Sequence, residues 1–339
     1  MLIVDKYKPL NSTESFFHTN EMIVLETMAK DDSIPHLIFA GPEGCGKKTL
    51  IRFLLEKIYG PNVNKVVDSI FVVNGSGNTS IDVTVKRSEF HIIIEPNNTN
   101  FDRYIIRDVV KDYAKKHSSS MFTSNKKFKI VVINNLDNLP YYAQYALRRT
   151  IEQYSSTCRF IMWCNSLSRV IDPLKSRCYC FKVPAPKETE IVHFIMHVSY
   201  CEQIKMTLEK LAFIISSCDN SIRKSLWLLQ SIKYEDTSMT SFDMVVNDIN
   251  DMVMNPKFNL EDIHEIRCLL YSIMITNYTG SNIIKSMLEK LLHNNEINDS
   301  KKRLIINRMA HYEYNLIKGR HEIMHIEPII ISIVKILKS

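Results

Sequence analysis

The sequence predicts an α/β domain with a parallel sheet, followed by all-α domains. Short apolar runs alternate with helix-like stretches up to residue 183, and after Pro184-Ala185-Pro186 only helical patterns of three- and four-residue spacing remain. The 339 residues are enough for two or three domains. Hydrophobic residues at 45% and charged residues at 24% are typical of globular proteins, so a disordered or fibrous chain is excluded.

The predicted sheet consists of apolar runs that stand between helices. Strands are expected at residues 37–40, 69–73, 91–94, 128–133 and 159–164, and helices at residues 47–59, 102–116 and 143–154. Crossover connections of this kind make the strands parallel, and the helices then cover both faces of the sheet.

The rest of the chain is expected to be helical. A first block covers residues 188–233, and a polar stretch at residues 234–241 separates it from a longer block that ends at residue 339. We therefore predict three domains, which are residues 1–183, 184–240 and 241–339.

The composition also indicates where the protein works and what it binds. No apolar run approaches the roughly 18 residues of a membrane span, and Asp5, Lys6 and Lys8 stand where a secretory leader is apolar. We expect an intracellular protein with no membrane partner. Eight cysteines without a CxxC pair predict neither a zinc site nor a disulfide framework. The net charge of +6 is compatible with a polyanionic partner but does not establish one.

A phosphate-binding loop is predicted directly after the strand at residues 37–40. Its members are Gly41, Pro42, Glu43, Gly44, Cys45, Gly46, Lys47, Lys48 and Thr49. Glycines let backbone N–H groups converge on phosphate oxygens, the helix N-terminus adds positive partial charge, and Lys47 adds a full charge. A tight turn without a ligand is the alternative, but the strand before the loop and the helix after it favour nucleotide binding.

The positions that normally hold Mg²⁺ and activate water are altered. Lys48 replaces the usual Ser or Thr hydroxyl, and the hydroxyl of Thr49 lies about 100° away on a helix. Asn134 and Asn135 follow the strand at residues 128–133, where carboxylates normally hold the metal and orient the attacking water. Chance substitution is the alternative, but three changes on one metal-dependent step favour nucleotide binding without hydrolysis and with weak or absent Mg²⁺.

Further motifs stand on both sides of the phosphate loop. They are Val4-Asp5-Lys6-Tyr7-Lys8-Pro9, Pro35-His36-Leu37, Ala143-Gln144-Tyr145-Ala146-Leu147-Arg148-Arg149-Thr150, Cys164-Asn165-Ser166, Ser176-Arg177-Cys178 and Arg223-Lys224-Ser225-Leu226. In this order they resemble the small subunits of replication factor C, the eukaryotic and viral sliding-clamp loader of the AAA+ class. The resemblance is closest to the small subunit whose phosphate loop also ends in Lys-Lys-Thr and whose acidic strand end is also degraded.

The resemblance implies a fold, a cofactor and partners. The fold is an AAA+ P-loop nucleotide-binding domain with a small helical lid and a C-terminal helical collar, and the cofactor is ATP or ADP. The implied partners are the other replication factor C subunits in a hetero-pentamer, the sliding clamp (PCNA) and primer-template DNA. The implied location is the nucleus, or a cytoplasmic viral factory if the source is a large DNA virus.

The resemblance also implies roles for residues outside the loop. Val4 and Lys8 would flank the adenine, with Lys8 where the family usually has Arg. Asn165 matches the first sensor near the γ-phosphate, and Arg223 matches the second sensor in the lid. Without the resemblance, Asn165 is more simply a loop-capping residue and Arg223 a solvated helix charge.

Arg177 matches the arginine that the family presents across a subunit interface. Such an arginine finger stabilises charge on a neighbour's transferring phosphate and does not serve its own nucleotide. A structural surface arginine at a helix end is the alternative.

A basic ridge is predicted on the helix at residues 102–116. Arg103, Arg107, Lys111 and Lys115 recur every four residues, and such a ridge can follow a DNA phosphate backbone. The alternative is an ordinary solvated helix face, because Asp108 and Asp112 reduce its charge.

Two further contacts stay open at the level of sequence. Arg148 and Arg149 lie about 100° apart on a helix, so one of them faces a DNA channel or a neighbouring subunit, but the sequence does not say which. Met121 and Phe122 either reach into a pocket of the clamp or fold back onto their own domain.

Two other functions compete with a clamp-loader subunit that does not hydrolyse ATP. An independently active AAA+ DNA-dependent ATPase or helicase motor is disfavoured by Asn134 and Asn135. An adaptor subunit shared among several clamp-loading or unloading assemblies would be recognised by its large partner.

Overall fold

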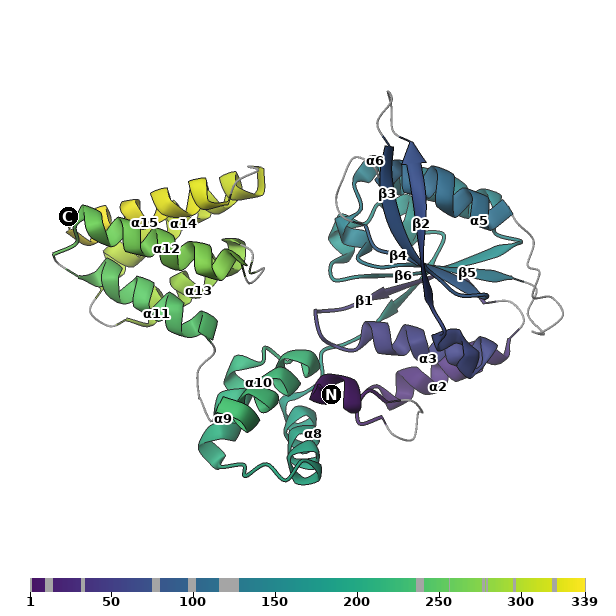
Figure 1. Ribbon diagram of the computed structural model, residues 1–339, viewed down its shortest axis with the longest axis horizontal. Coiled ribbons are helices and arrows are strands. Elements are labelled where there is room, and N and C mark those ends of the chain that lie inside the picture. Colours follow the sequence, from purple (N-terminus) through teal and green to yellow (C-terminus); the bar gives the residue numbers. More distant parts are fainter. Residues whose placement is uncertain are drawn as a thin grey trace. The chain divides into compact units, whose positions relative to one another are not determined.

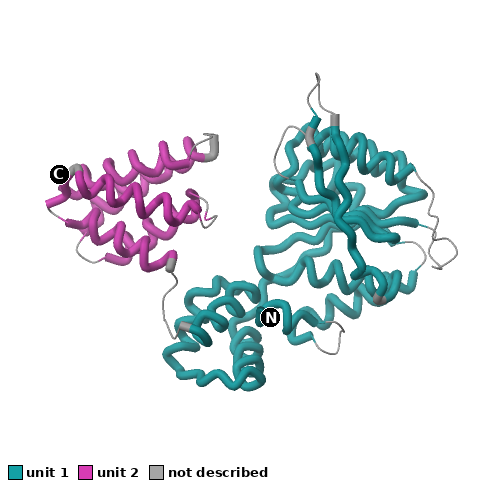
Figure 2. Tube along the Cα trace, viewed as in Figure 1, with its two compact units in different colours: residues 1–236 teal, residues 237–339 magenta. Residues whose placement is uncertain are grey.

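The computed structural model describes residues 2–9, 15–31, 34–74, 80–96, 102–115, 128–235, 241–255, 257–275, 278, 280–294, 297–318 and 322–338. The chain forms two compact units, residues 1–236 and residues 237–339, which Figure 2 colours separately. The predicted boundary between residues 183 and 184 falls inside the first unit. The division into three domains therefore stays a prediction.

A seven-stranded sheet, counted over the described residues, forms the centre of the first unit. The strands are β1 (Leu37–Ala40), β2 (Val67–Asn74), β3 (Ser80–Arg87), β4 (His91–Ile94), β5 (Lys129–Ile133), β6 (Cys158–Cys164) and β7 (Tyr179–Lys182). Their order in space is β2-β3-β4-β5-β6-β1-β7. The strands from β4 to β7 in this order pair in parallel, which confirms the predicted α/β sheet.

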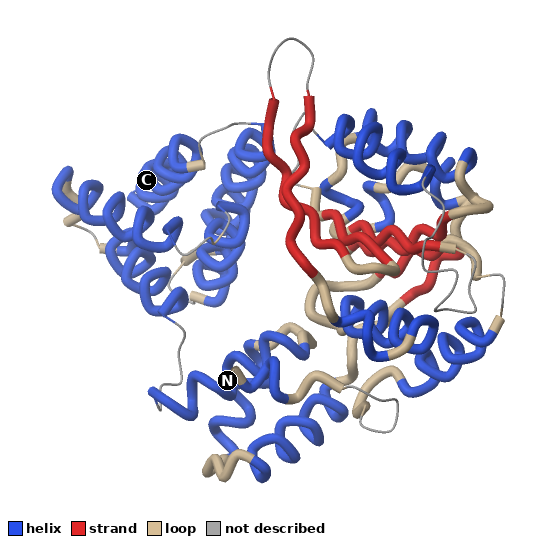
Figure 3. The backbone as a smooth tube through the Cα atoms, turned by 45° about the vertical axis from the view of Figure 1, so that its right-hand side comes forward, coloured by secondary structure: helices blue, strands red, loops and turns tan. Residues whose placement is uncertain are grey.

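The edge formed by β2 and β3 differs from the prediction. β2 pairs with β3 and β3 with β4 in antiparallel fashion, and the two long strands extend past the parallel core (Figure 3). A short connection between β3 and β4 leaves no room for a crossover helix, so these strands reverse direction. The apolar-run pattern missed β3 because polar residues alternate along it, and it missed β7 because that edge strand is short and largely exposed.

Helices cover both faces of the sheet (Figure 1). One face packs against α2 (Thr19–Lys30) and α3 (Lys47–Tyr59). The other face packs against α6 (Tyr141–Gln153) and a helical segment that comprises α4 (Asp102–Ile105), a π-helical turn (Ile106–Val110) and α5 (Lys111–Lys115). The alternation of side chains along β1 produces these two cores, because Leu37 and Phe39 join one and Ile38 and Ala40 join the other.

Three helices complete the first unit after α7 (Asp172–Lys175) and β7. They are α8 (Glu188–Cys201), α9 (Leu208–Ser217) and α10 (Ile222–Glu235). Their apolar core includes Ile195 and Leu229, and it takes in Phe17 and also Ile3 of α1 (Ile3–Lys6). The N-terminal segment is therefore packed on these helices.

The second unit is helical, as predicted. Its helices are α11 (Ser241–Met254), α12 (Leu260–Ile275), α13 (Gly280–His293), α14 (Asp299–Lys318) and α15 (Ile323–Lys338). Their buried apolar side chains, among them Val246, Leu270, Ile283 and Ile333, form one core of their own. In the described part of the chain, no helix has the length and apolar character that crossing a membrane requires.

Candidate nucleotide site

A cavity of about 430 Å³ lies where β1, β5 and β6 end in the first unit. The carboxyl ends of parallel strands are the usual ligand site of an α/β sheet. Of the predicted nucleotide-binding residues, the cavity is lined by Val4, Lys8, Glu43, Gly44, Gly46, Lys47, Lys48, Thr49, Asn165 and Arg223. The remaining three predicted residues, Gly41, Pro42 and Cys45, belong to the loop but do not line the cavity.

The cavity also contains residues that the sequence analysis missed. They include Tyr7, Phe17, His18, Trp163, Phe194 and Leu226. Most of these are aromatic or aliphatic side chains, which in the sequence resemble ordinary core residues. Folding brings them together from the N-terminal segment, the end of β6 and the helices α8 and α10, and no local pattern carries that information.

The phosphate loop is a tight turn that two glycines permit. Gly44 and Gly46 have φ of 74° and 102°, a left-handed region that favours glycine. A Cβ on Gly44 would also lie 1.8 Å from Oγ of Ser221, because the N–H of Ile222 donates to the Gly44 carbonyl at 3.2 Å. The loop is therefore in direct contact with the start of α10.

Lys47 is the buried cation of the site. Its Nζ donates to the carbonyls of Gly41 and Pro42, both at 2.6 Å, and to Oδ1 of Asn165 at 2.8 Å. Burial lowers the pKa of the Lys47 ammonium, and the nearby Asp137 carboxylate is among the groups that oppose this shift. Lys47 and Asn165 are thus brought together as expected for two groups that meet the same phosphate.

Asn165 is itself held in place. Its backbone N–H donates to Oδ2 of Asp137 at 3.2 Å, while its side chain accepts the hydrogen bond from Lys47. Asp137, which follows β5, therefore holds in place Asn165, which follows β6. The sequence shows this acidic residue in Asn134-Asn135-Leu136-Asp137, but it does not show its partner.

His18 supports the loop from the opposite side. Its ring Nε2 lies 2.7 Å from the carbonyl oxygen of Cys45, and its own backbone is left-handed with φ of 60°. The Cys45 side chain is buried in the apolar core beside α2 and α3, so it does not line the cavity. Nothing in the sequence around His18 predicts its contact with the Cys45 carbonyl.

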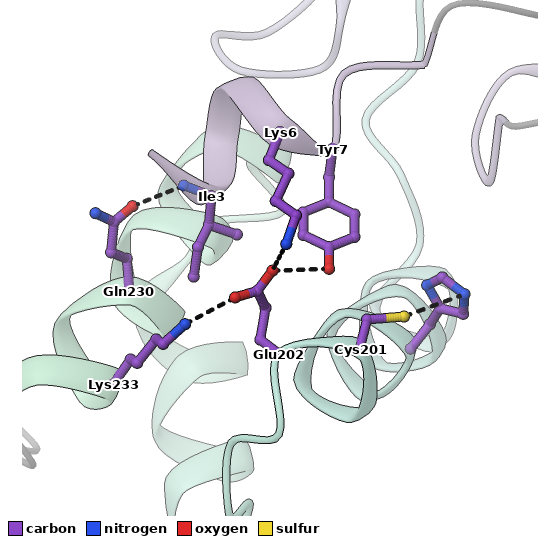
Figure 4. Close-up of polar contacts among 8 residues, drawn as sticks. Ile3, Lys6, Tyr7, Cys201, Glu202, Gln230 and Lys233 are labelled. Carbon is purple, nitrogen blue, oxygen red and sulfur yellow. Dashed lines mark hydrogen bonds and ion pairs between the residues drawn. The ribbon is translucent and has the colours of Figure 1, made fainter. Parts of the chain in front are cut away.

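The N-terminal segment is anchored by a buried carboxylate (Figure 4). Oε1 of Glu202 accepts from Nζ of Lys6 at 2.6 Å and from the hydroxyl of Tyr7 at 3.0 Å, and Oε2 accepts from Lys233 at 2.7 Å. These hydrogen bonds, the one from Lys233 first, lower the pKa of the Glu202 carboxyl to about 2. The N–H of Ile3 donates to Oε1 of Gln230 at 3.0 Å, which ties α1 to α10. The cavity wall formed by residues 4–8 therefore depends on Glu202.

The remaining predicted contacts around the nucleotide are looser. Lys8 lines the cavity but pairs with Asp5 at 2.5 Å. Nη1 of Arg223 lies 3.9 Å from Oε1 of Glu43, and the Arg223 side chain is about half exposed. Both cations are thus held by exposed carboxylates, and such surface pairs are weak enough to release a cation toward a phosphate.

The residues at the metal position do not fit Mg²⁺. Lys48 is 3.6 Å from Oε1 of Glu95, and the Asn134 side chain donates to the same oxygen at 2.5 Å. An ammonium and an amide group therefore occupy the neighbourhood where the metal needs oxygen ligands. Over the described residues, no group of three or more His, Cys, Asp or Glu side chains is placed to hold a metal ion. Glu95 is a further residue that the sequence analysis missed.

Arg177 lies at the amino ends of the parallel strands, whereas the phosphate loop lies at their carboxyl ends. It stands before β7, whereas the loop follows β1, and the two strands pair in parallel with Leu37 beside Tyr179. The four residues of β1 span about 13 Å at about 3.3 Å each. The sheet thus separates the Arg177 guanidinium from its own phosphate loop.

Arg177 is held by a carboxylate on α6. Its Nε lies 2.5 Å from Oε1 of Glu152, and its Nη1 donates to the carbonyl of Pro173 at 2.9 Å. Nε of Arg148 is 3.6 Å from the same Glu152 oxygen, while Arg149 is exposed. Arg148 and Arg177 therefore contact the same carboxylate, whereas the adjacent Arg149 is exposed to solvent.

The four predicted DNA-binding cations lie on the solvent side of their helical segment. Arg103, Arg107 and Lys115 are exposed and Lys111 is half-buried. A four-residue spacing drifts around an α-helix, but the π-helical turn contains more residues per turn and reduces this drift. Arg107 pairs with Asp108 at 2.8 Å. Met121 and Phe122, the predicted clamp contact, lie outside the described residues.

Comparisons with known proteins identify a matching family and several relatives of the chain. The family model described as DNA polymerase III, delta subunit, matches residues 17–187. A protein named as a replication factor C small subunit in Acanthamoeba polyphaga mimivirus is 38% identical, over 96% of this chain and 89% of the relative. Replication factor C subunit 3 of Arabidopsis thaliana is 30% identical, over 100% of this chain and 98% of the relative.

A solved structure shares the fold at low identity. It is a DNA polymerase III gamma subunit-related protein from Thermotoga maritima, which is 11% identical with a TM-score of 0.53 and covers 94% of this chain and 98% of its own. This similarity supports the architecture of a sheet covered by helices and followed by further helices, and nothing more specific.

The Glu202 anchor predicts the behaviour of residues 2–9. Glu202→Gln removes the charge that three donors share, so we expect amide hydrogen exchange in residues 2–9 to become roughly tenfold faster or more. Glu209→Gln, an exposed change on α9, is the matched control and should leave exchange unaltered. Mass spectrometry of exchanged peptides measures both. Unchanged protection in Glu202→Gln would show that apolar packing alone holds the segment.

The same anchor has a defined pH dependence. The folded pKa of about 2 lies below the ordinary Glu value of 4.5, so the stabilising contribution of Glu202 is complete above 4.5 and is lost as the pH falls toward 2. Protection of residues 2–9 should follow this direction in the wild type and depend much less on pH in Glu202→Gln, where the exposed Asp5–Lys8 pair still titrates.

Proposed function

Because the chain belongs to the replication factor C small subunits of the AAA+ clamp-loader class, we propose that it binds adenine nucleotide, hydrolyses little of it, and donates Arg177 to a neighbour's ATP site. Its relatives and family model make it a clamp-loader subunit in DNA replication. The observation that carries the finer proposal is the position of Arg177, which lies at the amino ends of the parallel strands, away from its own phosphate loop at their carboxyl ends. An arginine there can reach a nucleotide on a second subunit better than the nucleotide of its own chain.

Nucleotide binding is supported by the loop and by the cations around the cavity. The left-handed glycines shape the turn, Lys47 is positioned with Asn165, and Lys8 and Arg223 line the same cavity from two other parts of the chain. ATP and ADP share the phosphates and the adenine that these groups would meet. Weak dependence on Mg²⁺ follows from the unsuitable residues at the metal position.

Low hydrolysis is supported by the two residues directly after β5, Asn134 and Asn135, which carry amides where carboxylates normally stand. Asn134 is bonded to Glu95 and Trp163 through its side chain, and Asn135 has no charge with which to orient a water. An amide cannot act as the base that a carboxylate provides. The site therefore retains the groups for binding and lacks those for the chemical step.

The partners follow from the same proposal. A trans-acting arginine requires neighbouring subunits, so this chain works within a replication factor C-type hetero-pentamer that loads PCNA onto primer-template DNA. The exposed cations of residues 103–115 would follow the DNA phosphate backbone without reading its sequence. The location of this assembly is the nucleus, or a viral factory for a viral chain.

Nucleotide binding is tested at Lys47. We expect the isolated chain to bind a fluorescent ATP analogue, and Lys47→Ala to weaken that binding about tenfold to hundredfold because charge-assisted hydrogen bonds to phosphate are lost. Lys57→Ala, on the same helix and paired with Glu26, is the control and should bind as the wild type does. Equal binding by Lys47→Ala and wild type would exclude the phosphate loop as the nucleotide site.

Turnover by the isolated chain separates this proposal from an independently active motor. We expect release of phosphate from ATP to stay near background with and without DNA, because the two positions directly after β5 are Asn134 and Asn135 and offer no carboxylate to orient the attacking water. A robust turnover that Lys47→Ala abolishes would favour the ATPase or helicase motor instead. Identification of the co-purifying large subunit would separate a dedicated loader from a shared adaptor.

Arg177 is tested in the reconstituted complex. Arg177→Ala should leave assembly and this chain's nucleotide binding intact but remove the neighbouring site's share of the DNA- and clamp-stimulated ATPase rate. An arginine finger contributes about 10³–10⁵ in rate at one site, so the loss should approach that site's whole share. Arg177→Lys should not restore it, because an ammonium lacks the planar fork. Arg169→Ala, an exposed arginine change on the preceding connection, is the control. Equal rates at equal assembly would leave Arg177 a structural residue.

A further inference from the structure

One carboxylate bridges the two positions where a phosphate-loop protein normally holds its metal. Glu95 Oε1 accepts from the Asn134 side chain at 2.5 Å and lies 3.6 Å from Nζ of Lys48. The register places Ile94 beside Ile133, so Glu95 and Asn134 directly follow neighbouring parallel strands. The carboxylate of this site, Glu95, therefore follows β4, whereas the metal-binding carboxylates normally follow the strand that is β5 here.

Trp163 closes the arrangement into a ring of contacts. Its Nε1 donates to Oδ1 of Asn134 at 2.8 Å, and Nζ of Lys48 lies 5.2 Å from the centroid of its ring. Because indole N–H only donates, Oδ1 must face Trp163, and the amide nitrogen of Asn134 then faces Glu95. We call this ring the Glu95 network: Lys48, Glu95, Asn134 and Trp163.

The Glu95 network leaves Lys48 available to a ligand. Lys47 is already committed to two loop carbonyls and Asn165, whereas Lys48 has a long and partly exposed pair, with 52% of both its side chain and that of Glu95 accessible. The ammonium has three N–H donors and the pair with Glu95 is loose, so Lys48 can meet a phosphate oxygen while it still neutralises Glu95. Lys48 lines the same cavity as Lys47.

From these contacts we propose that Lys48 is the built-in cation of this nucleotide site and that it competes with a divalent metal for the Glu95 carboxylate. In the wild type the ammonium neutralises Glu95 and faces the phosphates, so the site needs no metal. This inference rests on the proposed nucleotide binding through Lys47 and adds Glu95 and Trp163 as the residues that position the second cation.

Restoring a hydroxyl at position 48 tests the competition. The affinity for a fluorescent ADP analogue is measured for each variant in Mg²⁺ and in EDTA. Wild type should bind equally in both. Lys48→Thr should bind about tenfold more weakly or worse in EDTA, since a charge-assisted contact is lost, and should recover in Mg²⁺ because the Glu95 carboxylate and a hydroxyl are then free for the metal.

The double variant identifies the carboxylate. Lys48→Thr combined with Glu95→Gln should lose affinity in EDTA and show no recovery in Mg²⁺. Lys57→Thr, a matched Lys-to-Thr change in a Lys–Glu pair of α3, should behave as the wild type and controls for helix propensity. Circular dichroism and a thermal melt show whether each variant is folded.

The outcomes separate this inference from the proposed function. Wild-type binding that needs Mg²⁺, or Lys48→Thr binding that is equal in Mg²⁺ and EDTA, overturns the inference while loss of binding in Lys47→Ala still supports the proposed function. Recovery of the double variant in Mg²⁺ also overturns it, because Glu95 would then not be the metal's competitor. If Lys47→Ala binds normally, the proposed function fails first.

Discussion

The common end of the parallel strands is the constraint on which the site depends. The carboxyl ends of β1, β4, β5 and β6 lie together at one end of the sheet, so the residues that follow these strands meet although they are far apart in the chain. Lys47 reaches Asn165 after β6, Asp137 after β5 holds that asparagine, and Glu95 after β4 reaches Lys48. Each contact requires the strands to be in this order.

The two ends of the parallel strands carry different groups. Residues after β1 line a cavity at the carboxyl ends of the strands. Arg177, which precedes β7, lies at their amino ends and pairs with Glu152. A subunit that binds nucleotide at one end and offers a guanidinium at the other can link two sites in a ring of subunits. In the proposed role, Arg177 would exchange the Glu152 carboxylate for a neighbour's phosphate.

The N-terminal segment connects the cavity to the helices after the sheet. Val4, Tyr7 and Lys8 line the cavity, while the segment that carries them is anchored by Glu202 between α8 and α9 and by Gln230 on α10. The start of α10 in turn bonds to the phosphate loop at Gly44. Hydrogen bonds therefore connect the N-terminal wall of the cavity and the phosphate loop to the same helix, α10.

The sequence by itself determined part of the sheet and the local chemistry of the phosphate loop. Apolar runs located β1 and β4, the helix-like stretch after the loop located α3, and the spacing of Gly41, Gly46 and Lys47 predicted the phosphate loop, because these properties depend on neighbouring residues. The tertiary structure alone decided that Glu95 would meet Lys48, that His18 would hold Cys45, and that Glu202 would anchor Tyr7. These pairs are separated by 27 to nearly 200 residues, and only the packing of the strands and helices places such residues within bonding distance.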